Sequence, residues 1–272
     1  MRVALTIAGS DSSGGAGIQA DIKTFQAHGV FGASAVTAVT VQNTREVRAV
    51  QEIDPAVVRD QIRCLFDDLP IHAVKIGMVA SIPLIAAVAE VLGPLTRPPV
   101  VLDPVMISKS GYALLAADAR RALVAHLFPL ATVVTPNIHE AEALLEAPIR
   151  DLDAMRRAAE RIRALGADKV VVKGGHLGGE RSTDVLYDGH EFRELTAARV
   201  DTPHTHGTGC TFSSAVAANL ALGRPFFEAV ARAKDYITAA IAHAPGLGKG
   251  HGPVQHFHAL YAAAGIDVAE DI

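Results

Sequence analysis

Short apolar runs rich in β-branched residues alternate along the chain with longer stretches whose apolar residues recur every three or four positions. The first pattern predicts buried strands over residues 3–8, 31–42, 47–53, 73–77, 100–103, 132–135, 169–173, 183–187 and 191–195. The second predicts helices over residues 16–28, 82–92, 117–127 and 151–165, with further helices opening at Asp54-Pro55, at Asn137 and after Gly207. Strands separated by helices of this length form βαβ units, so the chain is predicted to have an α/β fold. We expect a mostly parallel central sheet flanked by helices on both faces.

No internal repeat or low-complexity linker interrupts this alternation. We therefore expect a single domain over residues 1–272, with a core of about residues 3–243 and a tail over 244–272. The glycine- and histidine-rich stretch 246–252 is the one segment without a regular pattern.

Small and polar residues follow the predicted strands, where ligands bind in open α/β sheets. They are Gly9-Ser10-Asp11, Gln42-Asn43, Gly77-Met78, Asp103-Pro104, Asn137, Lys173-Gly174-Gly175 and the turn at Gly207. We expect these residues to meet at one edge of the sheet.

The turn Gly207-Thr208-Gly209-Cys210 runs directly into an alanine-rich helix. Converging backbone N–H groups and the helix N-terminus predict an anion site, although Gly-x-Gly alone can also be an ordinary loop-to-helix junction. A helix N-terminus lowers the pKa of a thiol, which would suit Cys210 to proton removal from an alcohol. Cys64, in an apolar helical context, is expected to be a buried structural cysteine.

Three polar side chains predict a cation site beside the phosphates. Asp103 ends a strand, and Asn137 and Glu140 open a helix; one or two carboxylates suffice for Mg²⁺. A plain capping box explains Asn137 and Glu140 equally well, and both readings can hold at once. Lys173 is expected to place its charge on the transferring phosphoryl group.

Composition and missing motifs exclude several classes of protein. The chain has a net charge of −4 without a run of like charges, which excludes a nucleic-acid footprint and a polybasic membrane patch. Two cysteines cannot form a disulfide framework, and no apolar stretch is long enough for a signal peptide core or a membrane helix, so a cytoplasmic protein is expected. Neither a P-loop nor a Gly-x-Gly-x-x-Gly turn occurs, and His204, His206 and Cys210 do not match a zinc pattern.

Seven ordered blocks resemble those of the ribokinase-like superfamily, specifically the hydroxymethylpyrimidine/phosphomethylpyrimidine kinases of thiamine biosynthesis. The resemblance spans roughly residues 3–243. The blocks are Ala8-Gly9-Ser10-Asp11-Ser12-Ser13-Gly14-Gly15-Ala16-Gly17-Ile18-Gln19-Ala20-Asp21, Val39-Thr40-Val41-Gln42-Asn43-Thr44, Lys75-Ile76-Gly77-Met78, Asp103-Pro104-Val105-Met106, Thr135-Pro136-Asn137 with Glu140, Val172-Lys173-Gly174-Gly175-His176 and Thr205-His206-Gly207-Thr208-Gly209-Cys210-Thr211.

The resemblance implies a sheet of roughly nine strands, a homodimer, and two ATP-dependent phosphorylations. The first acts on the hydroxymethyl group of 4-amino-5-hydroxymethyl-2-methylpyrimidine, and the second converts the monophosphate to the pyrophosphate. The implied catalytic residues are Gly207, Thr208, Gly209, Cys210 and Lys173. The implied ATP-binding residues are Asn137, Lys173, Thr208 and Lys234, and Asp103 and Glu140 match the Mg²⁺ side of the family site.

The expected substrate contacts are Gly9, Ala16, Asp21, Gln42, Met78 and Val105. Gln42 offers an amide donor and a carbonyl acceptor, which suit an aminopyrimidine edge. Asp21 would anchor the alcohol or the ring, and Met78 and Val105 would cover its apolar faces.

Two other functions remain open at this point. Pyridoxal kinases phosphorylate a hydroxymethyl group on a similar aromatic ring, so that activity, or a dual one, is the first alternative. The second is a non-catalytic protein that binds a pyrimidine or nucleotide. Residues 107–117 are rich in small side chains and are predicted to form a lid.

Overall fold

One nine-stranded sheet forms the centre of the part of the chain that the computed structural model describes, residues 1–95, 98–106, 115 and 117–266. The strand order is β3-β2-β1-β4-β5-β6-β7-β8-β9. Neighbours are parallel from β2 to β7, whereas β3 and the pair β8 and β9 are added antiparallel. The strands are β1 (Arg2–Ser10), β2 (Val30–Gln42), β3 (Val47–Glu52), β4 (Ile71–Ile76), β5 (Val100–Leu102), β6 (Val133–Val134), β7 (Lys169–Val172), β8 (Arg181–Tyr187) and β9 (Phe192–Ala198). The mostly parallel sheet expected from the sequence is confirmed.

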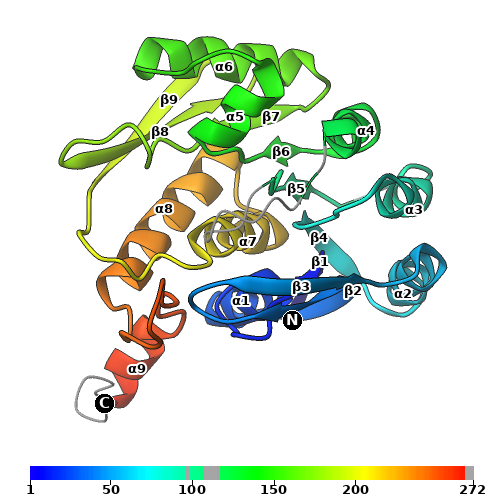
Figure 1. The fold of residues 1–272 in the computed structure, drawn as a ribbon, viewed down its shortest axis with the longest axis horizontal. Coiled ribbons are helices and arrows are strands. Elements are labelled where there is room, and N and C mark those ends of the chain that lie inside the picture. Colours follow the sequence, from blue (N-terminus) through cyan, green and yellow to red (C-terminus); the bar gives the residue numbers. More distant parts are fainter. Residues whose placement is uncertain (96–97, 107–114, 116, 267–272) are drawn as a thin grey trace.

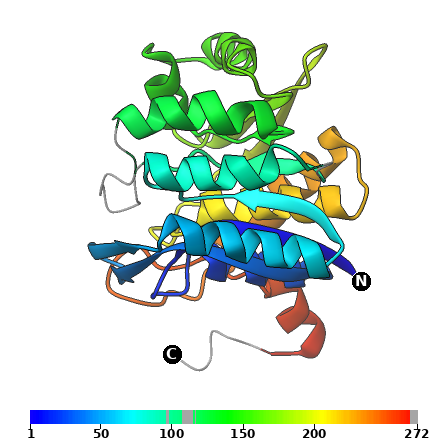
Figure 2. The same cartoon turned by 90° about the vertical axis from the view of Figure 1, so that its right-hand side faces the viewer.

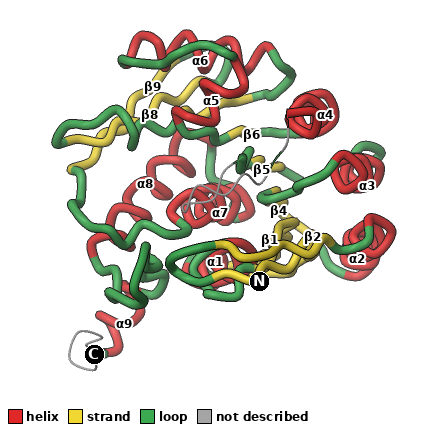
Figure 3. Tube along the Cα trace, in the orientation of Figure 1, coloured by secondary structure: helices red, strands yellow, loops and turns green. Residues whose placement is uncertain are grey.

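Helices cover both faces of this sheet (Figures 1 and 2). One face carries α1 (Gly17–Ala27), α7 (Thr208–Ala221) and α8 (Phe226–Ala242). The other carries α2 (Pro55–Asp68), α3 (Ile82–Leu92), α4 (Ala117–Leu127), α5 (Ile138–Leu145) and α6 (Leu152–Ala164), with the short 3-10 helix η1 (Phe128–Leu130). The last helix, α9 (His258–Ala264), projects from the body near the C-terminus. Figure 3 shows the strands as a middle layer between the helices.

The central strands are apolar on both sides because each faces a layer of helices. In β5, Val100 and Leu102 enter the core beneath α2, α3 and α4, whereas Val101 points to the core beneath α7. In β7, Val171 likewise faces away from its neighbours Val170 and Val172. This explains why the strands appear in the sequence as continuous apolar runs.

Local signals located most element boundaries to within two residues. The helices α3 and α4 have the predicted bounds. Asp54 caps α2 by accepting a hydrogen bond from Ala56 N at 2.8 Å, with Pro55 in the first turn. The predicted lid at residues 107–117 falls almost entirely outside the described residues.

The expectation of a buried Cys64 is wrong, because its side chain is exposed. In α2 the residues Val58 and Ile62 face the core, and a helix turns roughly 100° per residue, so Cys64 lies on the far side from Ile62. Among the histidines of the described residues, His206 and His256 are buried. Across the described ranges, the structure holds no helix that combines the length and the apolar character needed to cross a membrane.

Candidate active site

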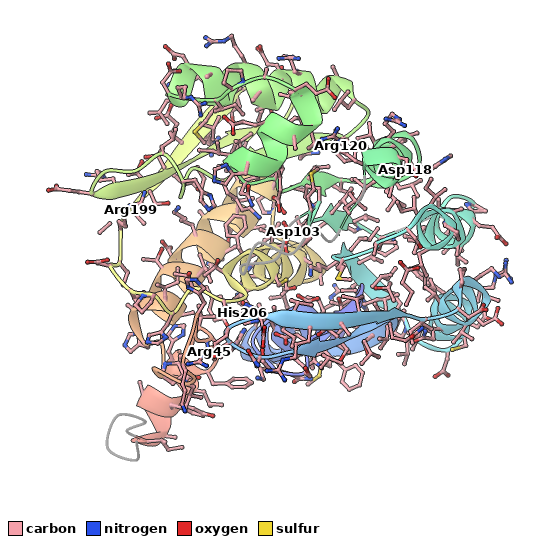
Figure 4. The ribbon with its side chains drawn as sticks, in the orientation of Figure 1. Arg45, Asp103, Asp118, Arg120, Arg199 and His206 are labelled. Carbon is pink, nitrogen blue, oxygen red and sulfur yellow. The ribbon has the colours of Figure 1, made fainter. Side chains whose placement is uncertain are left out.

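The carboxyl ends of the parallel strands border one cavity of about 480 Å³. The lining includes most residues predicted for the site: Gly9, Ala16, Gln42, Met78, Asp103, Val105, Asn137, Glu140, Lys173, Gly207, Thr208, Gly209 and Cys210. Asp103 and His206, labelled in Figure 4, lie on either side of the N-terminal end of α7. The fold thus brings together groups that the sequence separates by up to about 200 positions.

The turn before α7 depends on a glycine. Gly207 has a φ of +77°, and a Cβ at this position would lie 1.8 Å from the backbone oxygen of Gly15. No side chain of the described residues caps α7, and its first turn contains no acidic residue. The positive end of the helix is therefore directed at the cavity without a carboxylate from its own first turn, which favours a phosphate there.

Cys210 lies in the first turn of α7, where the N-terminus of α1 also reaches it through a hydrogen bond from the Gly17 backbone. Burial is the largest influence on this thiol, and it raises the pKa of Cys210 to about 11 although Lys75 acts in the opposite direction. The expectation that the helix N-terminus lowers the pKa is wrong for this site. Cys210 is a neutral thiol at pH 7 in the absence of ligands.

A buried ion pair lies beneath Cys210. Lys75 Nζ contacts both carboxylate oxygens of Asp21 at 2.9 Å, and both side chains are fully buried. Asp21 also accepts hydrogen bonds from the hydroxyls of Thr6 at 2.6 Å and Ser214 at 2.7 Å. Burial lowers the pKa of Lys75, but the charge and hydrogen bond of Asp21, together with the charges of Cys210 and Asp103, outweigh it and hold the pKa above the usual lysine value.

Asp21 therefore requires a correction: it was predicted to contact the substrate, but it lies below the cavity lining as the counter-ion of Lys75. Lys75 does line the cavity and was not among the predicted site residues. A signal was available, since a lysine inside an apolar strand needs a buried partner, and Asp21 stands on the apolar face of a helix.

The predicted cation side is a compact group of opposite charges. Lys173 Nζ lies 2.9 Å from Asp103 Oδ1, which also accepts a hydrogen bond from Thr135 at 3.2 Å. Asn137 and Glu140 form the predicted capping box at the start of α5, with bonds of 2.9 and 2.7 Å. The pKa of Glu140 is raised to about 7, because burial and the charge of Asp103 raise it more than the charge of Lys173 lowers it. The carboxylates of Asp103 and Glu140 share one positive neighbour, Lys173, so a hard cation bound beside them would stabilise their ionised forms.

A buried contact between Asp11 and His206 organises the loop between β1 and α1. Asp11 receives a hydrogen bond from His206 Nε2 at 2.7 Å and others from the backbone N–H groups of Ser13 and Ala16, both at 2.8 Å. Burial raises the pKa of Asp11, but the hydrogen bonds from His206 and Ser13 outweigh it and lower the pKa to about 2. Gln42 Nε2 lies 3.3 Å from His206 Nε2, which places the predicted pyrimidine contact beside this pair. In the sequence, His206 stood out only as part of the block before Gly207 and as a zinc ligand that the spacing did not support.

Lys234, predicted to bind nucleotide, lies outside the cavity lining. Its ammonium group is 2.8 Å from Asp184 and 3.2 Å from the hydroxyl of Ser182, and the side chain is buried. Its role in nucleotide binding stays a prediction.

The comparisons with known proteins agree with this geometry. A family model described as phosphomethylpyrimidine kinase matches residues 11–255. The chain belongs to this family. It is 52% identical over 259 residues to the hydroxymethylpyrimidine/phosphomethylpyrimidine kinase of Rhizobium meliloti, covering 94% of this chain and 97% of that protein.

Two further relatives extend the comparison beyond that enzyme. The thiamine biosynthesis bifunctional protein ThiED of Geobacter sulfurreducens is 52% identical over 252 residues. The match covers 93% of this chain but only 51% of ThiED, so the chain spans about half of that protein. Among solved structures, an ADP complex of Bacillus subtilis pyridoxal kinase superposes with a TM-score of 0.89 at 43% identity, covering 96% of this chain and 99% of that one. A phosphomethylpyrimidine kinase fold is thus shared with a kinase named for a different aromatic alcohol.

Proposed function

We propose that this phosphomethylpyrimidine kinase family member phosphorylates 4-amino-5-hydroxymethyl-2-methylpyrimidine and then its monophosphate, with ATP as the donor, in thiamine biosynthesis. The observation that carries the proposal is one cavity lined by the Gly207–Cys210 turn, by Lys173 with Asp103, and by Gln42. An anion site, a cation for the transferring group and an amide for the ring are the three components that such a reaction needs.

Phosphoryl transfer proceeds through a loose transition state, in which positioning and charge stabilisation outweigh base catalysis. The backbone of Gly207, Thr208 and Gly209 would hold the γ-phosphate, and Lys173 would neutralise the charge on its oxygens. Cys210 would contact the substrate hydroxyl, whose oxygen bonds to the γ-phosphorus as the bond from that phosphorus to ADP breaks, and the hydroxyl proton would pass to an oxygen of the transferred phosphoryl group. Because burial raises the pKa of the thiol, its main contribution would be to orient the hydroxyl.

Mg²⁺ would be held on the side of Asp103 and Glu140, mostly through water, with Asn137 and Thr208 near the ATP phosphates. When bound, the ion would neutralise charge on the ATP phosphates. The raised pKa of Glu140 supports this assignment, because a nearby cation would favour the ionised carboxylate that burial disfavours. The single domain, the homodimer, the cytoplasmic location and the nucleotide contact of Lys234 belong to the same proposal and rest on the family resemblance and the composition.

Pyridoxal kinase activity is the second candidate, favoured by the likeness to the Bacillus subtilis enzyme. The amide of Gln42 supports the pyrimidine as the main substrate, since it can pair with a ring nitrogen and an exocyclic amino group together. A protein that binds without catalysis is less favoured, because Lys173, Glu140 and Cys210 all border the cavity.

Mass spectrometry of a reaction with Mg-ATP tests the proposal. Wild type should add two phosphates in succession to the hydroxymethylpyrimidine, with a higher kcat/KM than for pyridoxal. The Cys210→Ala variant should lose most of the transfer, and Cys64→Ala, altered at an exposed thiol, should retain it. Transfer to pyridoxal alone would overturn the pyrimidine assignment, and no ATP consumption with either alcohol would overturn the assignment as a kinase.

A further inference from the structure

The residues between α8 and α9 do not form a free tail. Residues 246–257, here called the strap, pass along the tip of the β2–β3 hairpin and return below the N-terminus of α7 (Figures 1 and 2). Its glycine- and histidine-rich part, residues 246–252, has no sequence pattern that indicates a function. Its contacts reach three separate elements that border the Gln42 side of the cavity, where the alcohol substrate is proposed to bind.

The first contact is with the turn that follows Gln42. His251 N–H donates to the backbone oxygen of Thr44 at 2.8 Å, and Gly250 N–H donates to the Thr44 hydroxyl at 3.2 Å. A Cβ on Gly250 would lie 2.2 Å from the oxygen of Thr44, so this close approach requires glycine. The strap therefore holds the backbone next to the predicted pyrimidine contact.

The second contact is with His206. Its backbone N–H donates to Gly252 O at 3.0 Å, and the residue forms an isolated parallel bridge with Pro253. A Cβ on Gly15 would lie 3.1 Å from the Cβ of Pro253, so the strap also packs against the glycine loop before α1. The imidazole of His206 in turn binds Asp11. The strap thus supports the histidine that links Asp11 to the vicinity of Gln42.

The third contact lies under the first turn of α7. His256 Nε2 and the hydroxyl of Thr211 form a hydrogen bond of 3.1 Å, and both side chains are buried. Tyr236 fixes the other end by donating its hydroxyl to His256 O at 2.7 Å. Because Thr211 follows Cys210, this bond supports the turn that carries the thiol.

We propose that the strap is a positioning element for the alcohol substrate. It sets the relative placement of the Gln42 turn, His206 and the first turn of α7, and thereby the pose and affinity of the aromatic alcohol. The inference rests on the proposed function in one respect, that the alcohol occupies the Gln42 side of the cavity. Among the predicted ATP and Mg²⁺ residues, Lys173 directly follows β7 and Glu140 lies in α5, and the strap contacts described above touch neither element. Thr208 lies in the first turn of α7, near the bond between His256 and Thr211, so the contact of Gly250 with the turn after Gln42 is the one confined to the alcohol. A misplacement of about 1 Å can reduce a rate roughly 100-fold, so small changes in the strap should be measurable.

Gly250→Ala provides the sharpest perturbation, since the added methyl group would separate the strap from Thr44. We expect the KM for the pyrimidine alcohol to rise about tenfold while the KM for ATP stays within twofold. The matched control is Gly265→Ala, at the end of α9, where a φ of +67° strains alanine but nothing lies within 4 Å of the new methyl group. Its KM values should equal those of wild type at a comparable loss of stability. Equal rises of both KM values in Gly250→Ala, or no rise in either, would overturn the proposal.

His256 offers a second test that separates positioning from packing. The variant His256→Leu removes the bond to Thr211, whereas the amide of His256→Gln can replace the Nε2 partner. We expect kcat/KM for the alcohol to fall 10- to 100-fold in the leucine variant and to return to within threefold of wild type in the glutamine variant. Equal values in the two variants would contradict a positioning role for His256.

The comparison of KM values for the alcohol and for ATP tests the strap whichever alcohol is the substrate. If wild type phosphorylates pyridoxal instead, the proposed function fails. The KM values of Gly250→Ala for pyridoxal and ATP then test the positioning role of the strap in the same way. Calorimetric titration with each alcohol and with ADP provides a readout without turnover. An alcohol affinity that Gly250→Ala leaves unchanged would overturn the strap proposal even where the kinase assignment stands.

Discussion

Replacing Asp21 with asparagine tests whether this carboxylate binds substrate or supports the site from below. The structure gives it two contacts with Lys75 and hydrogen bonds from Thr6 and Ser214, all without exposure to solvent. Asp21→Asn keeps the shape of the side chain but leaves the buried charge of Lys75 without its counter-ion. The two possible roles of Asp21 predict different measurements.

The expected loss of stability follows from the burial of Lys75. Breaking a buried ion pair by removing one partner costs about 3–5 kcal/mol, because the remaining charge is desolvated and unpaired. For a chain of this size about 2–4 °C of Tm corresponds to each kcal/mol, so the Tm should fall on the order of 10 °C. Asp21→Asn with Lys75→Met removes both charges and should regain part of this loss. The pKa of Lys75 should drop in the single variant, because burial then acts without the charge of Asp21, the largest of the influences that oppose it.

Thermal unfolding followed by circular dichroism, together with kinetics at 25 °C, separates the two roles. We expect a large fall in Tm and a KM for the pyrimidine alcohol within about threefold of wild type. An unchanged Tm combined with a sharply raised KM would refute this reasoning. It would restore Asp21 as the substrate ligand that the sequence suggested.

Three further predictions concern the cavity and the strap. Gln42→Leu should raise the KM for the pyrimidine about 10- to 100-fold through the loss of two hydrogen bonds, and steady-state kinetics with an unaltered KM would remove Gln42 from the site. Lys173→Met should lower kcat about 100- to 1000-fold in a phosphate-transfer assay, since it removes a charge from the transition state, and a change below threefold would count against that role. Burial lowers the pKa of His256 to about 4, so between about pH 6.5 and pH 4 the unfolded chain binds this proton and the folded chain does not. The free energy of unfolding should therefore decrease as the pH is lowered through this range, by up to roughly 1.4 kcal/mol per pH unit. Urea titrations of His256→Gln should show a shallower fall in this window, and a profile parallel to that of wild type would exclude His256 as the cause.

The local sequence was sufficient to predict the helices and strands of this protein and most of the predicted residues that line its cavity. A strand or helix is predicted by spacing within about ten residues, which is why the bounds of α3 and α4 and the capping box of Asn137 and Glu140 agree with the structure. The carboxyl ends of parallel strands meet at one edge of a sheet, so residues such as Gln42 and Lys173 could be assigned to the same site from their positions after strands.

The tertiary structure decided which of these residues are partners and which are exposed. Asp21 and Lys75 are 54 positions apart, and only the packing of α1 and α7 against β1 and β4 makes them a buried pair. The pKa of Cys210 depends on what covers the thiol, so burial outweighs the helix N-terminus that the sequence displayed. The strap has no periodic pattern because backbone groups make most of the hydrogen bonds described above, and such bonds leave no trace in side-chain spacing. Burial and long-range pairing depend on the order and register of the strands, which no local segment encodes by itself.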